Sequence, residues 1–139
     1  MFQSCSKKCD LPENSVGGAI VKNVVMKSVN VKTTIDEGAG VIVRSEDENK
    51  DYGSCMVSYD EGENYQLIDF ATYDLLGVKT SILCSSSFKR SVEINDITKV
   101  VDYRIDLTQC EVGCDFNVTV YNWVLIPKVP ADYEIEVFL

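Results

Sequence analysis

Apolar and polar residues alternate along most of this chain, and many of the apolar positions hold β-branched or aromatic side chains. The alternation is clearest over residues 101–108, where the odd positions are apolar and the even positions polar, and it returns over residues 132–139. A period of two is typical of strands that bury one face and keep the other in water. The pattern therefore predicts a strand over each of these two ranges.

The same pattern predicts further strands over 19–25, 29–35, 41–44, 55–59, 66–73, 78–84, 88–94 and 116–126. Turn signals rich in Gly, Asp, Glu and Asn lie between them, at 36–40, 45–53, 60–64 and 95–96. Eight to ten short strands without helical spacers favour an all-β fold. We expect a single antiparallel β-sandwich of the jelly-roll or Greek-key type, with a partly open barrel as the alternative.

The range 116–126 departs from simple alternation, because Tyr121, Trp123 and Leu125 oppose a second apolar row of valine and isoleucine. Both faces of this strand therefore need cover. One interpretation is a central strand with one face in the core and the other beneath a loop. The other is a subunit contact through Tyr121 and Trp123, since exposed aromatic clusters often mark interfaces.

Residues 1–15 carry no strand pattern and are predicted to form a flexible N-terminal arm, which leaves residues 16–139 for the sandwich domain. A chain of 139 residues, of which 45% are hydrophobic, is long enough for one domain with its own core. Its cysteines are therefore not obligatory for folding, as they are in very small scaffolds.

The formal net charge of -9 argues against nucleic acid and anionic membrane surfaces as partners. No stretch approaches the roughly 18 apolar residues of a membrane span, and the first fifteen residues lack the apolar segment of a signal peptide. We therefore expect no nucleic-acid partner and no membrane. Cysteines without an export signal further indicate thiols that oxidise after the protein leaves its site of synthesis.

The chain contains no histidine, which removes Ser-His-Asp and Cys-His catalysis as well as imidazole metal sites. The carboxylates of 101–108 and 132–139 fall on the wet faces of their strands, where they keep a sheet soluble. The acidic stretches 46–51 and 60–64 offer oxygen ligands to calcium without EF-hand spacing, so solvated hairpin tips are preferred and calcium is the alternative. We expect no enzyme activity, no cofactor and no resident metal.

The six cysteines fall into three pairs along the chain, Cys5 and Cys9, Cys55 and Cys84, and Cys110 and Cys114. The middle pair shares the parity of inward apolar residues, so buried structural thiols are expected there. The other four have a spacing compatible with zinc, but disulfides are preferred over zinc and over free thiols. A thiol on a mobile arm can reach a neighbouring subunit, which makes these four the candidate cross-linking residues.

Three features follow one another along the chain: an apolar residue ahead of the first cysteines, a β domain of jelly-roll size, and the strand 105–108 running into Cys110 and Cys114. Together they resemble the subunits of bacterial endospore appendages. The resemblance implies fibres that grow by β-strand augmentation, with connectors that form disulfides to neighbouring subunits. Carried over by position, only Cys5, Cys9, Cys110 and Cys114 take cross-linking roles. The chain departs from the family in lacking an adjacent Cys-Cys pair in the connector and in the close spacing of Cys5 and Cys9.

These observations predict a non-enzymatic structural protein at an extracellular, cell, spore or virion surface. Its main partner is a second copy of itself, and its product is a fibre or a coat. The alternative is a secreted or viral binding module that recognises a glycan or a host protein through loops around Tyr52, Tyr65 and Tyr73. The first function predicts polymers held by disulfides, whereas the second predicts a soluble monomer.

Overall fold

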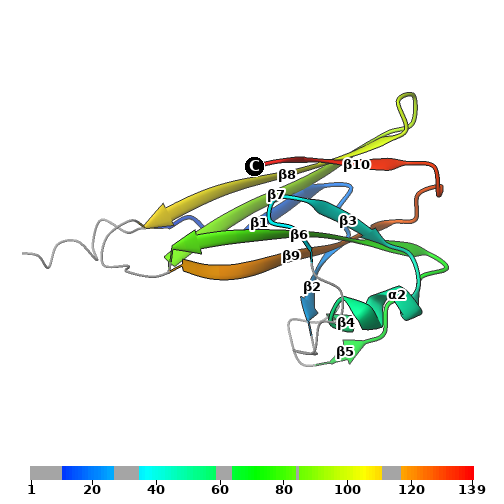
Figure 1. The fold of residues 1–139 in the computed structure, drawn as a ribbon, viewed down its shortest axis with the longest axis horizontal. Coiled ribbons are helices and arrows are strands. Elements are labelled where there is room, and N and C mark those ends of the chain that lie inside the picture. The colour runs from blue at the N-terminus through cyan, green and yellow to red at the C-terminus, as the bar shows by residue number, and fades with distance from the viewer. Residues whose placement is uncertain (1–10, 27–34, 59–63, 84, 111–116) are drawn as a thin grey trace, which may run out of the picture.

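The computed structural model describes residues 11–26, 35–58, 64–83, 85–110 and 117–139. Within these ranges the chain is mainly β and forms two layers, with one helix beside them (Figure 1). The elements are β1 (Ser15–Gly18), β2 (Lys22–Met26), β3 (Gly40–Val43), α2 (Glu46–Asp51), β4 (Cys55–Ser58), β5 (Tyr65–Gln66), β6 (Tyr73–Leu83), β7 (Ser85–Asn95), β8 (Val100–Cys110), β9 (Asn117–Pro127) and β10 (Glu134–Phe138).

The described strands form two hydrogen-bonded sheets. The four-stranded sheet has the order β1-β7-β8-β10, and the six-stranded sheet has the order β3-β6-β9-β2-β4-β5. Four strands, β6 to β9, have 11 residues each and are the longest of these. β7 and β8 form a hairpin in one sheet, and β6 and β9 pair in the other. The predicted all-β class is confirmed.

The expectation of antiparallel pairing fails at both edges of the four-stranded sheet. β1 runs parallel to β7, with Ser15 opposite Lys89, and β10 runs parallel to β8, with Glu134 opposite Val100. Parallel neighbours need a crossover connection, and β9 in the other sheet supplies it between β8 and β10. The direction of an edge strand thus depends on a path through the opposite sheet, which alternation within that strand does not encode.

The main core lies between the two sheets and is built from the inward rows of the four long strands. Leu76, Tyr103 and Val124 are fully enclosed there. On β8 the odd residues face this core, as the sequence predicts. Burial of each large apolar side chain contributes about 1.5–3 kcal/mol, so this shared core is what holds the two sheets together.

β9 buries both of its faces over residues 122–126, as predicted for a central strand. Its even residues face the main core, while Trp123 and Leu125 belong to a second cluster on the opposite side of the six-stranded sheet. Cys55 and Val57 of β4 pack into this second cluster with the inward parity expected of them. The sequence therefore identified the correct face for these four residues.

The predicted strand over 66–73 is replaced by the short β5 and a turn. The turn is organised by Asp69, whose side chain accepts hydrogen bonds from the backbone of Ala71 and the hydroxyl of Thr72 at 3.1 and 2.8 Å. The backbone oxygen of Asp69 also accepts from the amide of Tyr73 at 2.9 Å. An aspartate that bonds to nearby backbone in this way favours a turn over a sheet.

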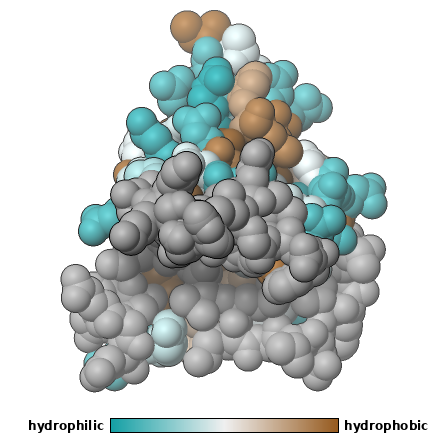
Figure 2. Space-filling model, turned by 90° about the vertical axis from the view of Figure 1, so that its left-hand side faces the viewer, coloured by the Kyte–Doolittle hydropathy of each residue, from teal (hydrophilic) through white to brown (hydrophobic). Residues whose placement is uncertain are grey.

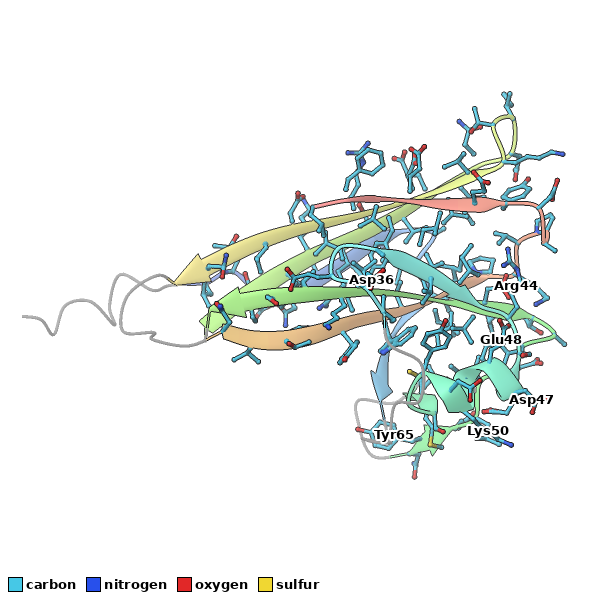
Figure 3. All side chains as sticks on the ribbon, in the orientation of Figure 1. Asp36, Arg44, Asp47, Glu48, Lys50 and Tyr65 are labelled. Atoms are coloured by element: carbon cyan, nitrogen blue, oxygen red, sulfur yellow. The ribbon has the colours of Figure 1, made fainter. Side chains whose placement is uncertain are left out.

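The acidic stretch 45–53 contains helix α2 instead of an extended hairpin tip. Ser45 is its N-cap and accepts a hydrogen bond from the amide of Glu48, and Glu48 in return accepts one from the amide of Arg44 (Figure 3). Acidic residues in the first turn and Lys50 in the last turn suit the helix dipole. Its carboxylates are thus placed to start a helix, which explains why an acidic run need not be a loop.

Helix α2 does not support the calcium alternative. Among the described residues, no group of three or more His, Cys, Asp or Glu side chains could hold a metal ion. Of the second acidic stretch, 60–64, residues 60–63 lie outside the described ranges.

The predicted boundary between arm and domain falls inside β1, because Ser15 already pairs with β7. Ahead of it, the side-chain oxygen of Asn14 accepts a hydrogen bond from the amide of Phe88 at 2.7 Å. Residues 1–10, on which the flexible-arm prediction mainly rests, lie outside the described ranges. In the part of the chain that the structure covers, no helix is long and apolar enough to cross a membrane.

Candidate functional site

The long strands of the two sheets extend beyond the ends of the short strands that pair with them. β10 pairs with β8 only as far as Arg104, although β8 continues to Cys110. β3 pairs with β6 only as far as Val78, and a single bridge from Glu37 to Lys79 lies beyond it. No strand in the described part of the chain pairs with the outer edges of 105–108 and 80–83.

These two open edges lie at the same end of the molecule. Leu83 at the end of β6 is opposite Asn117 at the start of β9, and Ser85 at the start of β7 is opposite Cys110 at the end of β8. Because β6 and β7 are separated by one residue, all four strand ends lie together, at the left of Figure 1. Unpaired edges of this kind are templates for pairing with another chain.

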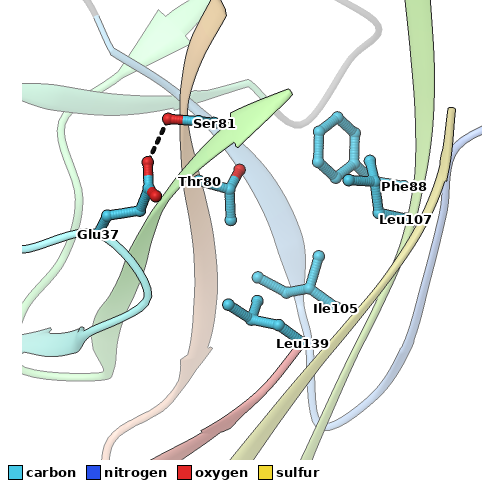
Figure 4. A pocket seen from close by; sticks show the side chains of 7 residues that line it. All are labelled: Glu37, Thr80, Ser81, Phe88, Ile105, Leu107 and Leu139. Atoms are coloured by element: carbon cyan, nitrogen blue, oxygen red, sulfur yellow. Dashed lines mark hydrogen bonds between the residues drawn. The ribbon is translucent and has the colours of Figure 1, made fainter. Parts of the chain in front are cut away.

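A hollow opens between the two edges, and we call it the inter-sheet hollow. It has a volume of about 190 Å³ and mostly apolar walls (Figure 4). Its rim carries one carboxylate, that of Glu37, which accepts a hydrogen bond from the hydroxyl of Ser81. Its lining consists of Glu37, Thr80, Ser81, Phe88, Ile105, Leu107 and Leu139.

The hollow is the point at which the main core reaches the surface. Phe88 and Ile105 are core residues, 7% and 2% exposed, and they also line its wall. Leu139, which follows β10 directly, is 69% exposed at its edge. An edge strand placed over 105–108 would cover this apolar surface, so the open edges and the hollow form one candidate site.

Of the predicted cross-linking residues, Cys110 is the one whose backbone the structure describes. It is the last residue of β8 and lies beside the open edges. Cys5, Cys9 and Cys114 lie outside the described ranges, and so does Cys84, which was expected to be buried. The roles expected of these four cysteines therefore remain predictions from the sequence.

The described beginning of the chain lies close to the end of β8. Pro12 and Glu13 line a small pocket together with Lys89 of β7 and Thr108 of β8. Thr108 is two residues from Cys110 in the sequence. The segment that carries the first two cysteines thus joins the domain on the side of the molecule where the candidate site opens.

The two aromatic residues predicted as an interface are placed differently from each other. Trp123 is only 3% exposed and makes an edge-on contact with Tyr52, with ring centroids 6.0 Å apart and an interplanar angle of 64°. It has almost no surface to offer a second subunit, because its own chain covers it. Tyr121 is half-buried against the same cluster and keeps some free surface.

Two of the tyrosines proposed for ligand binding have packing roles. Tyr52 and Tyr73 pack against the second cluster, where they cover Trp123 and its neighbours. Tyr65 lies in the two-residue strand β5. The placement of Tyr52 and Tyr73 favours the packing role over the binding role.

A buried polar group beside the hollow was missed from the sequence. Arg90 points inward from β7 and donates from Nε and Nη2 to the side-chain oxygen of Asn122, at 3.1 and 2.7 Å. The amide nitrogen of Asn122 donates to Val78 and Thr80 at 2.9 and 3.0 Å. Desolvation lowers the pKa of Arg90. The signal was available, because Arg90 has the same parity as the inward residues Phe88 and Val92.

Cys55 is fully buried and should be chemically inert in the folded protein. Its burial, and secondarily the negative charge of Glu46, raises the pKa of the thiol to about 12 from an ordinary 9.0. We expect no labelling of Cys55 by N-ethylmaleimide at pH 8 in the native, reduced chain and full labelling in denaturant, as read by peptide mass spectrometry. Rapid labelling in the native chain would contradict the burial.

The same shift makes the fold sensitive to alkali. The folded state holds the Cys55 proton more tightly than the unfolded state, so this contribution to stability is complete below pH 9 and is lost as the pH rises toward 12. Burial raises the pKa of Tyr103 as well, which adds a loss in the same direction. The melting temperature is therefore expected to fall above pH 9.

Comparison of the chain with protein-family models, with curated proteins and with solved structures finds no match. The function proposed for it therefore rests on its residues and their arrangement.

Proposed function

We propose that this chain is a structural protein that assembles with copies of itself into an extracellular fibre or coat. In this proposal the domain is a β-sandwich of the jelly-roll or Greek-key type, and subunits join by adding strands to one another's open edges. The observation that carries the proposal is the pair of edges 105–108 and 80–83, with which no strand among the described residues pairs, together with the apolar hollow between them.

An added strand would pair with the edge and cover the apolar hollow. Main-chain hydrogen bonds from an incoming strand would pair the backbone groups of the edge that have no strand partner in the described part of the chain, and its alternate side chains would fill the hollow. A strand added along 105–108 would continue the line of β10, which already runs parallel to β8. Soluble proteins commonly protect such edges with charges, prolines or bulges. Residues 80–83 are Thr, Ser, Ile and Leu and carry no charge or proline of their own, whereas 105–108 includes Asp106.

Disulfides through the N-terminal segment are proposed to lock the assembled subunits. Cys110 ends β8 beside the open edge, and the described start of the chain reaches the same strand near Thr108. A bond from Cys5 or Cys9 to Cys110 or Cys114 of a neighbour would make a reversible strand contact covalent. The resemblance to endospore appendage subunits supports this arrangement and a location at a cell, spore or virion surface.

Electrophoresis and electron microscopy test the proposal. The native protein at high concentration is expected to form ordered polymers and to run as a ladder that reductant collapses to the monomer. Cys110→Ser should weaken the ladder while polymers remain visible, because strand pairing does not need the disulfide. Cys55→Ala is the matched control, since the enclosed thiol of Cys55 takes no part.

A chain that stays monomeric at high concentration, with and without reductant, would refute self-assembly. Internal disulfides in such a monomer would then favour the binding-module alternative.

A further inference from the structure

The start of the described chain is held against β7 at two points. Residues 15–18 form β1 and run parallel to β7, with Ser15 opposite Lys89. One residue earlier, the side-chain oxygen of Asn14 accepts a hydrogen bond from the amide of Phe88 at 2.7 Å. The chain ahead of β1 therefore enters the domain at a defined place.

Ahead of Asn14, the chain reaches the outer face of the four-stranded sheet. Pro12 and Glu13 line a small pocket together with Asp106 and Thr108 of β8. Asp106 and Thr108 are exposed even positions of β8, whereas the odd positions of this strand face the main core. Pro12 therefore lies at the outer surface of β8, close to the point where that strand ends.

Cys110 has a defined position at that end. Its backbone pairs with Ser85 of β7, and it is the last residue of β8. It follows Thr108 by two residues, which is about 7 Å along a strand, and alternation assigns the two positions to the same face. The start of the chain and Cys110 thus meet on one face of one strand.

The length of the chain brings Cys9 within reach of Cys110. Cys9 precedes Pro12 by three residues, and three residues span at most about 10 Å. A disulfide adds to this reach, because it joins Cα atoms that are about 4.4–6.8 Å apart. Since Pro12 and Thr108 line the same small pocket, this length covers the path from Pro12 to the end of β8.

Cys5 has a longer reach than Cys9. It precedes Pro12 by seven residues, which span up to about 25 Å. A thiol at that distance can pass beyond its own domain to another subunit, whereas Cys9 stays near the end of β8. The two cysteines of the N-terminal segment are therefore suited to different partners.

We propose that Cys9 and Cys110 of the same chain form a disulfide in the unassembled subunit. The two thiols lose two electrons and two protons to a low-molecular-weight disulfide, which is reduced to two thiols. A short tether gives a thiol an effective concentration in the millimolar range, so in dilute solution the bond within one chain forms ahead of a bond to a neighbour.

The nearest cysteine in the sequence is a weaker partner for Cys9. A bond between Cys5 and Cys9 closes a loop of only a few residues, whereas a bond between Cys9 and Cys110 closes one of about a hundred. The longer loop restricts the unfolded chain more, and the folded domain already holds its two ends together. Under thiol exchange the bond to Cys110 is therefore preferred.

Solvent can reach the end of β8. Figure 2 looks at the molecule from the end where the long strands meet, with the four-stranded sheet uppermost, and most of the coloured atoms in its upper part are hydrophilic. Thr108 and Gln109, the two residues before Cys110, are exposed. A thiolate from a second copy can therefore approach from the outer face.

The internal bond keeps Cys110 from neighbours until subunits meet. The thiolate of Cys5 of a second copy then attacks the sulfur of Cys110, the bond between Cys9 and Cys110 breaks, and Cys9 leaves as a thiolate that takes up a proton. No oxidant is consumed, because one disulfide replaces another. Covalent joining thus follows strand pairing, which brings Cys5 of the second copy close. This exchange rests on the proposed function, whereas the internal bond is a property of one chain.

Disulfide mapping of the dilute chain tests the internal bond. The full chain is treated with oxidised glutathione at low micromolar concentration, free thiols are blocked, and the digest is analysed by mass spectrometry. We expect a peptide pair that joins Cys9 to Cys110. When isotope-labelled and unlabelled chains are mixed before oxidation, fewer than one pair in ten should combine the two isotopes. Cys9 joined mainly to Cys5 or Cys114, or a majority of mixed pairs, would overturn the assignment.

Serine variants test the pairing by a second readout. In Cys9→Ser, Cys110 has lost its partner and is expected to carry glutathione at least ten times more often than in the wild type. Cys5→Ser is the matched control, because it removes the other cysteine of the same segment and should leave Cys110 joined to Cys9. Equal glutathione on Cys110 in Cys9→Ser and in the wild type would contradict the bond.

The assembled protein separates this inference from the proposed function. In polymers of the wild type, Cys110 is expected to be joined to Cys5 of a second copy, with Cys9 free. Disulfide-linked polymers in which every subunit keeps the bond from Cys9 to Cys110 would overturn the exchange step. A chain that forms the internal bond but never assembles would overturn the proposed function alone, and a chain that assembles from monomers without the bond would overturn this inference alone.

Discussion

Replacing Asn122 with leucine is expected to lower the free energy of unfolding by about 2–4 kcal/mol. Asn122 is fully buried, and its side-chain oxygen accepts both hydrogen bonds that the guanidinium of Arg90 donates within the core. Leucine has the same branched shape but no acceptor, so the cation would stay between the sheets without its partner. The measurement is urea denaturation followed by circular dichroism.

The damage should come from the orphaned cation and not from the loss of one amide. Within the described residues Arg90 forms no salt bridge, so Asn122 is its polar partner. The double variant Arg90→Met/Asn122→Leu removes the charge together with its acceptor, and we expect it to recover much of the lost stability. A double-mutant cycle then gives the coupling of the pair. A double variant no more stable than Asn122→Leu alone would show that the cation is not the cause.

Replacing Gly77 with valine is expected to destabilise the fold by about 3 kcal/mol. Gly77 lies opposite Trp123 in the pairing of β6 with β9, and a Cβ at this position would come within 2.2–2.7 Å of the tryptophan ring. The ring is enclosed by the second cluster and cannot move aside without opening it. Trp123 is the one tryptophan of the chain, so its fluorescence reports the displacement directly.

Gly17→Val provides the control for this substitution. A Cβ at Gly17 meets no atom within 4 Å, so the same change in β1 should leave the unfolding midpoint nearly unchanged. We expect a red-shifted emission and a lower midpoint for Gly77→Val alone. Equal midpoints for the two variants would contradict the steric argument.

Alternation predicted the strands whose two faces differ most in polarity. In β8 every odd residue from Val101 to Leu107 is apolar, and the strand was found almost to its ends. The start of β6 was missed because Asp74 and Gly77 interrupt the apolar pattern there. Asp74 is nevertheless fully buried, since Lys128 and the amide of Val129 bond to its carboxylate at 2.9 and 3.0 Å. These partners are more than fifty residues away, so no local pattern announces them.

The candidate site could be predicted only in part. The cysteines can be read directly from the sequence, and the turn at 95–96 was recognised from Asn95. The open edges were not, because they arise from unequal strand lengths in neighbouring positions, which are settled by the pairing of β3 with β6 and of β10 with β8. The hollow exists because neighbouring strands end at different points. It therefore also depends on how the whole chain folds.

The long strand pairs have a consequence for mechanics. β6 is paired with β9, and β7 with β8, at 11 positions each, and all four strands run along the long axis of the molecule (Figure 1). A pull along that axis loads the hydrogen bonds of each ladder together, in shear, instead of opening them one at a time. A subunit held at its two ends would therefore resist a pull along its strands. It would resist far less a force that peels β10 or β1 from the side.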